Sequence, residues 1–396
     1  MTTVEDIQYN NGRVLIRVDF NVPLNDDLKV TDDNRIRATI PTIKAVLKNG
    51  GRPVLMSHLG RPKGAYDDKF SLSNIVYKLE ELLGAKVNFA LDCVGDEAVK
   101  ASNELKSGEV LLLENLRFHE GETSGDKGFA QELAKNGDYY VNDAFGTAHR
   151  AHASTAVIAE FFKGKKAFGL VMAAEIENVT KVLNSTEKPV TAIVGGAKVS
   201  SKIAILENLV SKLDNLIIGG GMAYTFLKAQ GGKVGSSLVE DDFLETAREI
   251  LKTAEAKGVK VYLPVDSVNA DKFDNNAAKE TTPADEVKDG WMGLDVGPDT
   301  VTMLDEVLVN SKVILWNGPM GVFEFSNFEF GTREVAKSIV KATEAGAFSI
   351  VGGGDSVAAV KKFEMANQVS YVSTGGGAML EYLEGKELPG IKAILN

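Results

Sequence analysis

Arginines and glycine triplets divide this 396-residue sequence into two chemically different halves. Eight of the ten arginines precede residue 151, and all three Gly-Gly-Gly triplets follow residue 218. Guanidinium keeps its charge and makes bidentate contacts to phosphate or carboxylate. Glycine lets a ligand approach backbone N–H groups closely. The division predicts one half-site for a multiply charged anion and another for nucleotide phosphates, which suggests phosphoryl transfer between them.

In the first half, the side chains that suit an anion mostly follow or end predicted strands. The candidates, with their segments, are Arg17 and Asp19 (RVDFNVP), Arg35 and Arg37 after a polar loop, His58 and Arg61 (SHLGRPKG), Arg117 (ENLRFHEGE) and Arg150 (AFGTAHRAHAS). A surface salt bridge is the ordinary role of a single arginine, but the shared position favours one binding patch. His149 and His152 have no third ligand nearby, so we do not expect a metal between them.

In the second half, GGGDS (Gly352–Ser356) follows the predicted strand Phe348–Val351 and precedes a helix. Phosphate oxygens can approach such a turn, and the helix N-terminus adds partial positive charge. Asp355 is a candidate ligand for a phosphate-bound Mg²⁺, whereas Ser356 is a candidate for phosphate binding or only for capping the helix. A tight turn without any ligand is the alternative. Val357 breaks the Gly-x-Gly-x-x-Gly pattern, which disfavours a common dinucleotide fold.

Three other glycine-bearing turns follow predicted strands. IVGGAKVSSK contains Gly195 and Gly196 and then Lys198 and Lys202, whose spacing predicts two ammonium groups on one helical face. A polyphosphate would relieve their conflict with the helix dipole, and two solvated lysines are the alternative. The other turns are Gly219–Gly221, for an adenine or ribose, and Trp316–Gly321, with Glu324 beyond it as a candidate for ribose hydroxyls.

Short apolar runs alternate with helical patterns along the chain, which predicts parallel sheets covered by helices. The predicted strands are Val14–Val18, Pro53–Met56, Val110–Leu113, Tyr139–Asn142, Thr191–Val194, Asn215–Ile218, Lys312–Trp316 and Phe348–Val351. The predicted helices are Pro41–Lys48, Ser71–Leu83, Phe129–Lys135, Ala173–Leu183, Lys202–Val210, Asp241–Lys257, Glu329–Ala345 and Asp355–Phe363. Ligands of such sheets bind at the carboxyl ends of the strands.

Composition indicates a two-domain globular protein. The sequence is 44% hydrophobic and 25% charged, with a net charge of −11. Its pI near 5.1 argues against nucleic acid or an anionic membrane as a partner. Cys93, the only cysteine, is expected to be a small core residue and to give no metal cluster. No apolar leader opens the sequence and no run reaches ~20 apolar residues, so we expect a cytoplasmic protein.

Six segments together resemble phosphoglycerate kinase of the bacterial type. They are RVDFNVP (Arg17–Pro23), SHLGRP (Ser57–Pro62), NDAFGTAHRAH (Asn142–His152), GGAKVSSK (Gly195–Lys202), WNGPMGVFE (Trp316–Glu324) and GGGDS (Gly352–Ser356). The resemblance runs in order from about residue 13 to the end of the chain. Several of these motifs are long and distinctive, and the length fits the bacterial form.

The resemblance implies roles for residues in both halves. It implies a substrate site of Asp19, Phe20, Asn21, Arg35, His58, Leu59, Gly60, Arg61, Arg117 and Arg150. It implies a nucleotide site of Gly196, Lys198, Lys202, Gly220, Gly293, Asn317, Pro319, Glu324, Gly353, Gly354, Asp355 and Ser356. Arg35 and Lys198 would act on the transferred phosphoryl group. Asp355 would hold Mg²⁺, Glu324 the ribose, and Gly293 would line the adenine pocket.

The implied reaction is reversible phosphoryl transfer between 1,3-bisphosphoglycerate and ADP, which gives 3-phosphoglycerate and ATP. The implied fold is two Rossmann-like, doubly wound α/β domains facing across a cleft that closes. We expect a substrate domain in residues 1–168, a nucleotide domain in 169–375 joined by the Ala173–Leu183 helix, and a tail, 376–396, that packs on the first domain. We expect a monomer. Another carboxylate kinase, or a non-catalytic nucleotide-binding protein, are the alternatives, and a substrate panel would separate them.

Overall fold

The computed structural model describes residues 1–62 and 64–396. These form two compact units, Met1–Glu177 with Glu387–Asn396, and Asn178–Lys386. The first division falls within helix α6 (Leu170–Leu183) rather than at Gly169, because this unbroken helix begins in the first unit and ends in the second. The second division falls at residue 387 rather than 376, because α13 (Gly377–Leu383) packs against α7 (Ile203–Leu209) of the second unit.

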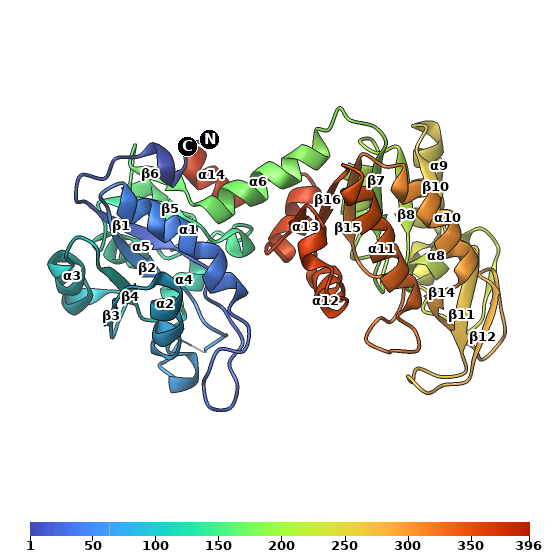
Figure 1. Cartoon of the computed structure of the whole chain (residues 1–396), viewed down its shortest axis with the longest axis horizontal. Helices are drawn as coiled ribbons and strands as arrows, with labels where there is room; N and C mark the ends of the chain where they lie inside the picture. The colour runs from blue at the N-terminus through green and yellow to red at the C-terminus, as the bar shows by residue number, and fades with distance from the viewer. Residues whose placement is uncertain (63) are drawn as a thin grey trace. The chain divides into compact units, whose positions relative to one another are not determined.

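The first unit is built on six parallel strands in the order β3-β4-β2-β1-β5-β6 (Figure 1). The strands are β1 (Arg13–Arg17), β2 (Arg52–Met56), β3 (Val87–Ala90), β4 (Val110–Leu113), β5 (Tyr139–Asn142) and β6 (Lys166–Phe168). The helices are α1 (Asn34–Lys48), α2 (Val76–Leu83), α3 (Gly95–Glu104), α4 (Glu120–Ser124), α5 (Lys127–Ala134) and the C-terminal α14 (Pro389–Leu395). The chain adds strands first on one side of β1 and then on the other, so the sheet is doubly wound.

The second unit repeats this plan with six parallel strands in the order β10-β8-β7-β15-β16-β17. They are β7 (Val190–Val194), β8 (Asn215–Ile218), β10 (Lys260–Tyr262), β15 (Val313–Asn317), β16 (Phe348–Val351) and β17 (Tyr371–Val372). The remaining helices are α8 (Met222–Ala229), α9 (Leu244–Ala256), α10 (Pro298–Val309), α11 (Phe330–Glu344) and α12 (Gly354–Lys362). The predicted α/β class with two parallel-sheet domains is confirmed.

The second unit also has two small sheets that the sequence did not predict. One is antiparallel, β12 (Lys279–Pro283), β11 (Asp266–Ala270) and β14 (Met292–Val296), and the other pairs β9 (Lys233–Val234) with β13 (Glu286–Val287). The burial of β12 alternates between exposed and partly exposed residues, so this strand lacks the apolar run that marks a central strand. Such short, polar strands carry little periodic signal.

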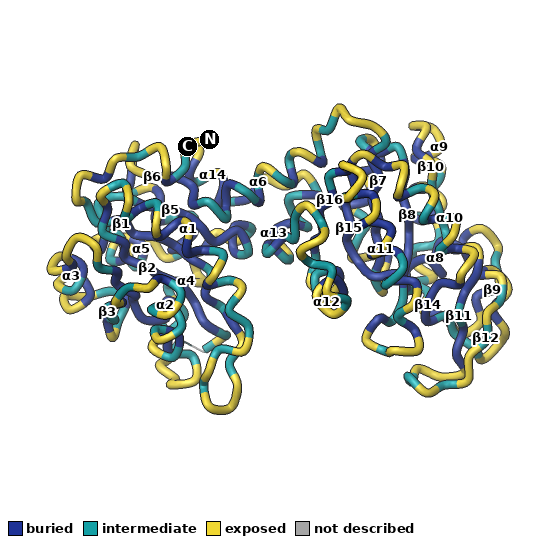
Figure 2. The backbone as a smooth tube through the Cα atoms, viewed as in Figure 1, coloured by how far each residue is buried: buried dark blue, intermediate teal, exposed yellow. Residues whose placement is uncertain are grey.

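Burial explains why the central strands were predictable. Every residue of β4 and of β7 is buried, as expected for strands covered on both faces (Figure 2). Helix α1 was predicted from Pro41 but begins at Asn34. Its buried face, which includes Ile36, Ile40 and Ile43, continues across the proline, and this packing outweighs the lost hydrogen bond. Among the described residues, no helix has the length and apolar character that a membrane span requires.

Candidate functional site

The cation-bearing segments of the first unit meet at one edge of its sheet. Strand β1 lies between β2 and β5, where the strand order reverses. In doubly wound sheets this switch point binds ligands at the carboxyl ends of the strands. The segments after β1, β2, β4 and β5 carry Asp19, His58, Arg117 and Arg150 respectively. The structure therefore gathers the predicted cations around one region.

Arg35, near the start of α1, is held by the segment that follows β1. Its Nη1 donates to the two carboxylate oxygens of Asp19 at 3.0 and 3.2 Å and to the carbonyl of Asn21 at 3.2 Å. The Gly60 N–H donates to the side-chain oxygen of Asn21 at 2.8 Å, which ties in the segment after β2. Gly60 has φ +64, and a Cβ there would lie 2.2 Å from Phe70. The Arg35 side chain is still 39% exposed, so an anion can reach it.

Arg17, one of the candidate cations, is fully buried and serves a different purpose. Its Nε donates to the Ser154 hydroxyl at 2.9 Å, and its Nη2 lies 3.1 Å from Nδ1 of His58. The Ser154 hydroxyl in turn donates to the buried carboxylate of Glu122 at 2.6 Å. Arg17 thus holds His58 in place, and Glu122 supplies the compensating charge. The sequence did not mark Glu122 or Ser154, because both look like ordinary polar surface residues.

Two other residues that were predicted to bind substrate can offer it only backbone groups. Phe20 and Leu59 are 0% and 3% exposed and belong to the core of the first unit. Their side chains fill that core and hold the adjacent turns. Any contact between these residues and a substrate must therefore come from N–H or C=O groups, such as the Leu59 carbonyl, which already accepts from Asn115 at 2.8 Å.

Arg117 is the partly buried member of the patch, whereas Arg61 and Arg150 are exposed. Nη1 of Arg117 donates to the Gly60 carbonyl at 2.8 Å. Burial lowers the pKa of Arg117, and the charges of Arg17, Arg150 and Arg61 act in the same direction. These guanidinium groups remain charged at neutral pH. Their mutual repulsion is relieved when an anion binds among them, so the patch is suited to phosphate and carboxylate groups.

Two histidines of this region, His58 and His152, are neutral at physiological pH. Burial lowers the pKa of His58 well below its usual value, and Arg17, Arg117 and Arg35 lower it further. Burial followed by the charge of Arg117 lowers the pKa of His152 to about 4. Nδ1 of His152 lies 3.9 Å from the Glu122 carboxylate, which is too long for a hydrogen bond to restore the charge. Neutral imidazoles add hydrogen-bonding groups to the patch without adding repulsion.

In the second unit, glycine-bearing turns pack backbone to backbone at the switch point between β7 and β15. The Gly195 N–H donates to the Asn317 carbonyl at 2.8 Å. A Cβ on Gly195 would lie 2.2 Å from the Pro319 carbonyl oxygen, and one on Gly220 would lie 2.6 Å from both N and O of Gly196. Any larger residue would push these turns apart. Because the glycines of these turns carry no side chains, main-chain groups line the adjacent pocket on this side.

That pocket has a volume of about 550 Å³ and contains half of the predicted nucleotide site. The predicted residues that line it are Gly196, Gly220, Gly293, Pro319, Glu324 and Asp355. Further lining residues that the sequence did not indicate include Tyr224, Leu238, Phe273, Met292, Asp295 and Val322. Most of these are apolar, as expected for a pocket that holds a planar base. They come from α8, from β14 and from the loops after β9, β11 and β15, and of these segments only the one after β15 carries a recognisable motif.

Lys202 is hydrogen-bonded to Asn317, and Asn317 to the turn after β16. The Lys202 ammonium donates to the side-chain oxygen of Asn317, whose Nδ2 donates to the Gly352 carbonyl at 2.8 Å. Gly353 has φ +89, and a Cβ there would lie 2.5 Å from Nδ2 of Asn317. Burial lowers the pKa of Lys202, while the charge of Asp355 opposes that shift. An anionic phosphate would stabilise this partly desolvated ammonium group.

Lys198 and Lys202 do not share a helical face, so that prediction was wrong. Helix α7 begins only at Ile203, and the residues before it form turns. The backbone N–H and the hydroxyl of Ser200 both donate to the Glu240 carboxylate, at 3.0 and 2.6 Å, which draws this segment out of helical geometry. Lys198 is exposed and Lys202 is partly buried. Their geometry leaves Lys198 the more accessible cation.

The first turn of α12 was predicted to bind phosphate and Mg²⁺. Gly353 is the N-cap of this helix, Gly354 begins it, and Asp355 is exposed in its first turn and lines the pocket. The buried Ser356 hydroxyl accepts from the Gly318 N–H and neither caps the helix nor faces solvent. An accessible carboxylate beside a helix N-terminus suits a magnesium ion that arrives on nucleotide phosphates.

Comparisons with known proteins place this geometry in a family. The family model for phosphoglycerate kinase matches residues 4–386. A phosphoglycerate kinase of Porphyromonas gingivalis is 52% identical, with 99% of each chain covered, and a cytosolic one of Triticum aestivum is 52% identical over 99% of this chain and 97% of its own. A solved phosphoglycerate kinase structure from Coxiella burnetii matches with a TM-score of 0.91 at 41% identity, over 99% of this chain and 98% of that one. The chain belongs to the phosphoglycerate kinase family.

Proposed function

We propose that this chain catalyses reversible phosphoryl transfer between 1,3-bisphosphoglycerate and ADP, which yields 3-phosphoglycerate and ATP. The observation that carries the proposal is the pair of half-sites at the switch points of two parallel sheets. One half-site gathers guanidinium groups around neutral imidazoles, and the other offers glycine-lined turns beside a pocket of about 550 Å³. Family membership over nearly the whole chain supports the same conclusion.

The residues of the first unit bind and orient the carboxylate substrate. Arg61, Arg117 and Arg150 hold its phosphate and carboxylate charges, and His58, fixed by Arg17, adds a neutral hydrogen-bonding group. Arg35 is pre-positioned by Asp19 and stabilises the charge that develops on the transferred group. Phosphoryl transfer of this kind requires positioning and charge stabilisation rather than a covalent intermediate. The proposal therefore needs no activated nucleophile on the protein.

The residues of the second unit bind the nucleotide. The glycine turns and the start of α12 receive its phosphates, with Lys198 and Lys202 as cations, and Glu324 lies in the pocket lining beyond them, in reach of the ribose. Asp355 would hold Mg²⁺, which would neutralise part of the charge of the phosphates. Each proposed half-site uses residues of a single chain, which supports a monomer.

The test is a substrate panel assayed for ADP formation from ATP. We expect turnover with 3-phosphoglycerate and at least about 10²-fold less with acetate, aspartate or glutamate, because those carboxylates lack the phosphate that the arginine patch binds. Preference for another carboxylate would identify a different acyl-phosphate-forming kinase. Nucleotide binding without turnover on any substrate would identify a non-catalytic binding protein.

A further inference from the structure

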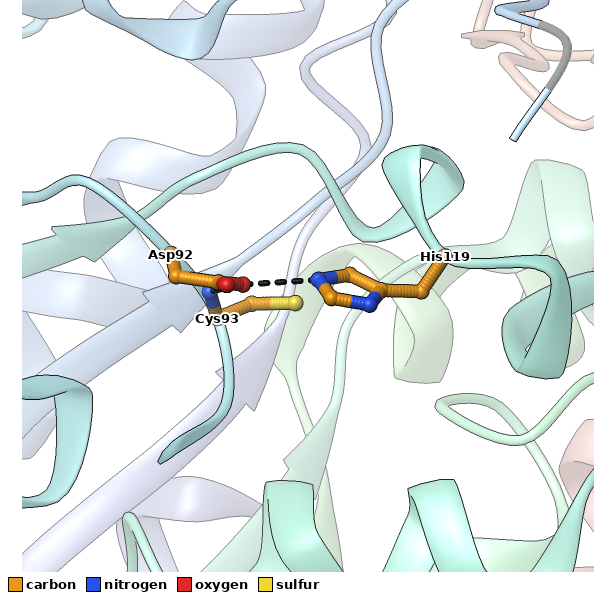
Figure 3. Close-up of side chains that lie close together, drawn as sticks. All are labelled: Asp92, Cys93 and His119. Carbon is orange, nitrogen blue, oxygen red and sulfur yellow. Dashed lines mark hydrogen bonds and ion pairs between the residues drawn. The ribbon is translucent and has the colours of Figure 1, made fainter. Parts of the chain in front are cut away.

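A cluster of three potential metal ligands lies in the first unit, among residues that have no part in the proposed reaction. Asp92 and Cys93 follow β3, and His119 follows the short 3₁₀ turn Leu116–Phe118 (Figure 3). The carboxylate, thiol and imidazole atoms all lie within 4.8 Å of one another. Figure 3 shows the thiol and the carboxylate directed toward the same side of the imidazole ring. Within residues 1–62 and 64–396, this is the one such cluster of His, Cys, Asp and Glu side chains.

We infer that Asp92, Cys93 and His119 form a binding site for a borderline-soft divalent cation such as Zn²⁺. Sulfur, imidazole nitrogen and carboxylate oxygen are its usual protein ligands, at about 2.3, 2.0–2.1 and 2.0–2.2 Å. Three protein ligands leave a fourth position for water, as in open zinc sites. Mg²⁺ prefers an all-oxygen shell, so the cluster does not duplicate the nucleotide-linked site at Asp355.

The local structure already holds the three ligands close to the required positions. Nε2 of His119 lies 2.7 Å from Oδ1 of Asp92, a contact that a metal ion would replace. The same carboxylate oxygen accepts from the Cys93 N–H at 2.6 Å, which fixes it beside the thiol. The imidazole packs against the Phe129 ring at a centroid distance of 5.1 Å. Binding therefore requires small movements of side chains and no rebuilding of the backbone.

Two of the three ligands are partly exposed, so a metal ion can reach the site from solvent. The side chains of Asp92 and His119 are 49% and 32% exposed, whereas Cys93 is fully buried at the base of the cluster. Burial raises the pKa of the Cys93 thiol, so the free thiol keeps its proton and reacts slowly. An ion there would link the loop after β3 to the segment that carries Arg117.

The experiment titrates the nucleotide-free protein with Co²⁺, a spectroscopic substitute for Zn²⁺. We expect a saturable thiolate-to-cobalt charge-transfer absorption at one ion per chain, reversed by Zn²⁺ and unaffected by excess Mg²⁺. Cys93→Ala should abolish this absorption, and His119→Gln should weaken binding at least about 10-fold, since losing even an outer-shell partner typically has that effect. Circular dichroism of each metal-free variant separates lost ligation from unfolding.

Asp355→Asn is the matched control, because it alters the proposed magnesium carboxylate in the other unit and should leave the cobalt absorption unchanged. The inference is overturned if the wild-type protein shows no charge-transfer absorption, or if folded Cys93→Ala binds Co²⁺ as tightly as the wild type. Neither result bears on the proposed kinase activity, which is assayed with 3-phosphoglycerate and ATP.

Discussion

The arginine patch shows how burial assigns different tasks to residues of one type. Arg17 is fully buried and is partnered by Ser154 and His58, so it orients other groups rather than substrate. Arg35 is 39% exposed, with Asp19 fixing its guanidinium group. A pre-positioned, accessible cation can stabilise a developing negative charge without reorganising during the reaction. Arg35 is therefore the arginine from which we expect the largest effect on the chemical step.

Arg35→Ala and Lys198→Ala should each lower kcat on the order of 10²–10³-fold with modest changes in KM, because both cations act mainly on transition-state charge. Steady-state kinetics with 3-phosphoglycerate and ATP measures this. Arg37→Ala is the matched control, since Arg37 lies on the same helix, pairs with Asp33 and is 60% exposed. Near-normal kcat in both test variants would remove these residues from the catalytic assignment.

The pKa of His152 gives the protein a predictable loss of stability in acid. Burial lowers this pKa from 6.5 to about 4. Between those values the unfolded chain binds more protons than the folded chain, so the free energy of unfolding should fall as the pH falls from about 6.5 to about 4. His152→Gln should reduce this slope in urea unfolding measured across that range. His58 contributes in the same direction and leaves a residual slope, and an unchanged slope in the variant would contradict the burial argument.

Helix α6 depends on a buried carboxyl group at its start. Oδ1 of Asp143 accepts from the N–H groups of Val171 and Met172 at 2.8 and 3.3 Å. A Cβ on Gly169 would lie 2.1 Å from this oxygen, so the approach requires glycine. Burial raises the pKa of Asp143 to about 7, with the cap hydrogen bonds opposing the shift. The helix that spans the division between the units is thus fixed to the first unit at its first turn.

Asp143→Ala should lower the free energy of unfolding of the first unit by about 1–2 kcal/mol, the usual effect of losing a helix cap. Asp143→Asn should retain most of this stability at neutral pH, because its amide oxygen can still accept. The native Asp143 holds its proton up to about pH 7, so its contribution to stability falls as the pH rises from about 4 through about 7. Denaturant unfolding should show that Asp143→Asn removes this component. Equal losses in both variants would contradict the capping role, because the isosteric amide keeps both the packing and the acceptor oxygen.

The elements that the sequence predicted are those with a strong local signal. Strand β4 is a continuous apolar run and β8 is apolar after Asn215, and both match their predicted bounds. Helix α8 and the loop after β11 carry no ligand-binding motif, so Tyr224 and Phe273 could not be assigned to the pocket from their neighbours in sequence. Charge patterns indicated the cationic segments, but only the packed structure distinguishes the buried Arg17 from the accessible Arg35.

In our proposal, the two units contribute different parts of the chemistry. The first contains the arginine patch, and the second contains the glycine turns with the pocket. The chain passes between them twice, within α6 and near residue 387. Since neither unit holds groups for both reactants, our proposed reaction requires the units to approach when both are bound. Exclusion of water at that moment would protect the acyl phosphate from hydrolysis.

Small-angle scattering should therefore show a smaller radius of gyration with 3-phosphoglycerate and MgATP together than for the free protein. Either ligand alone should produce a smaller decrease, because only the pair makes contacts that depend on closure. Arg150→Ala is the control: it should weaken binding of 3-phosphoglycerate, so at a ligand concentration that saturates only the wild type it should behave like the nucleotide complex. If the radius in the ternary complex equals that of the free protein, the closure argument fails, and the two half-sites must be joined in another way.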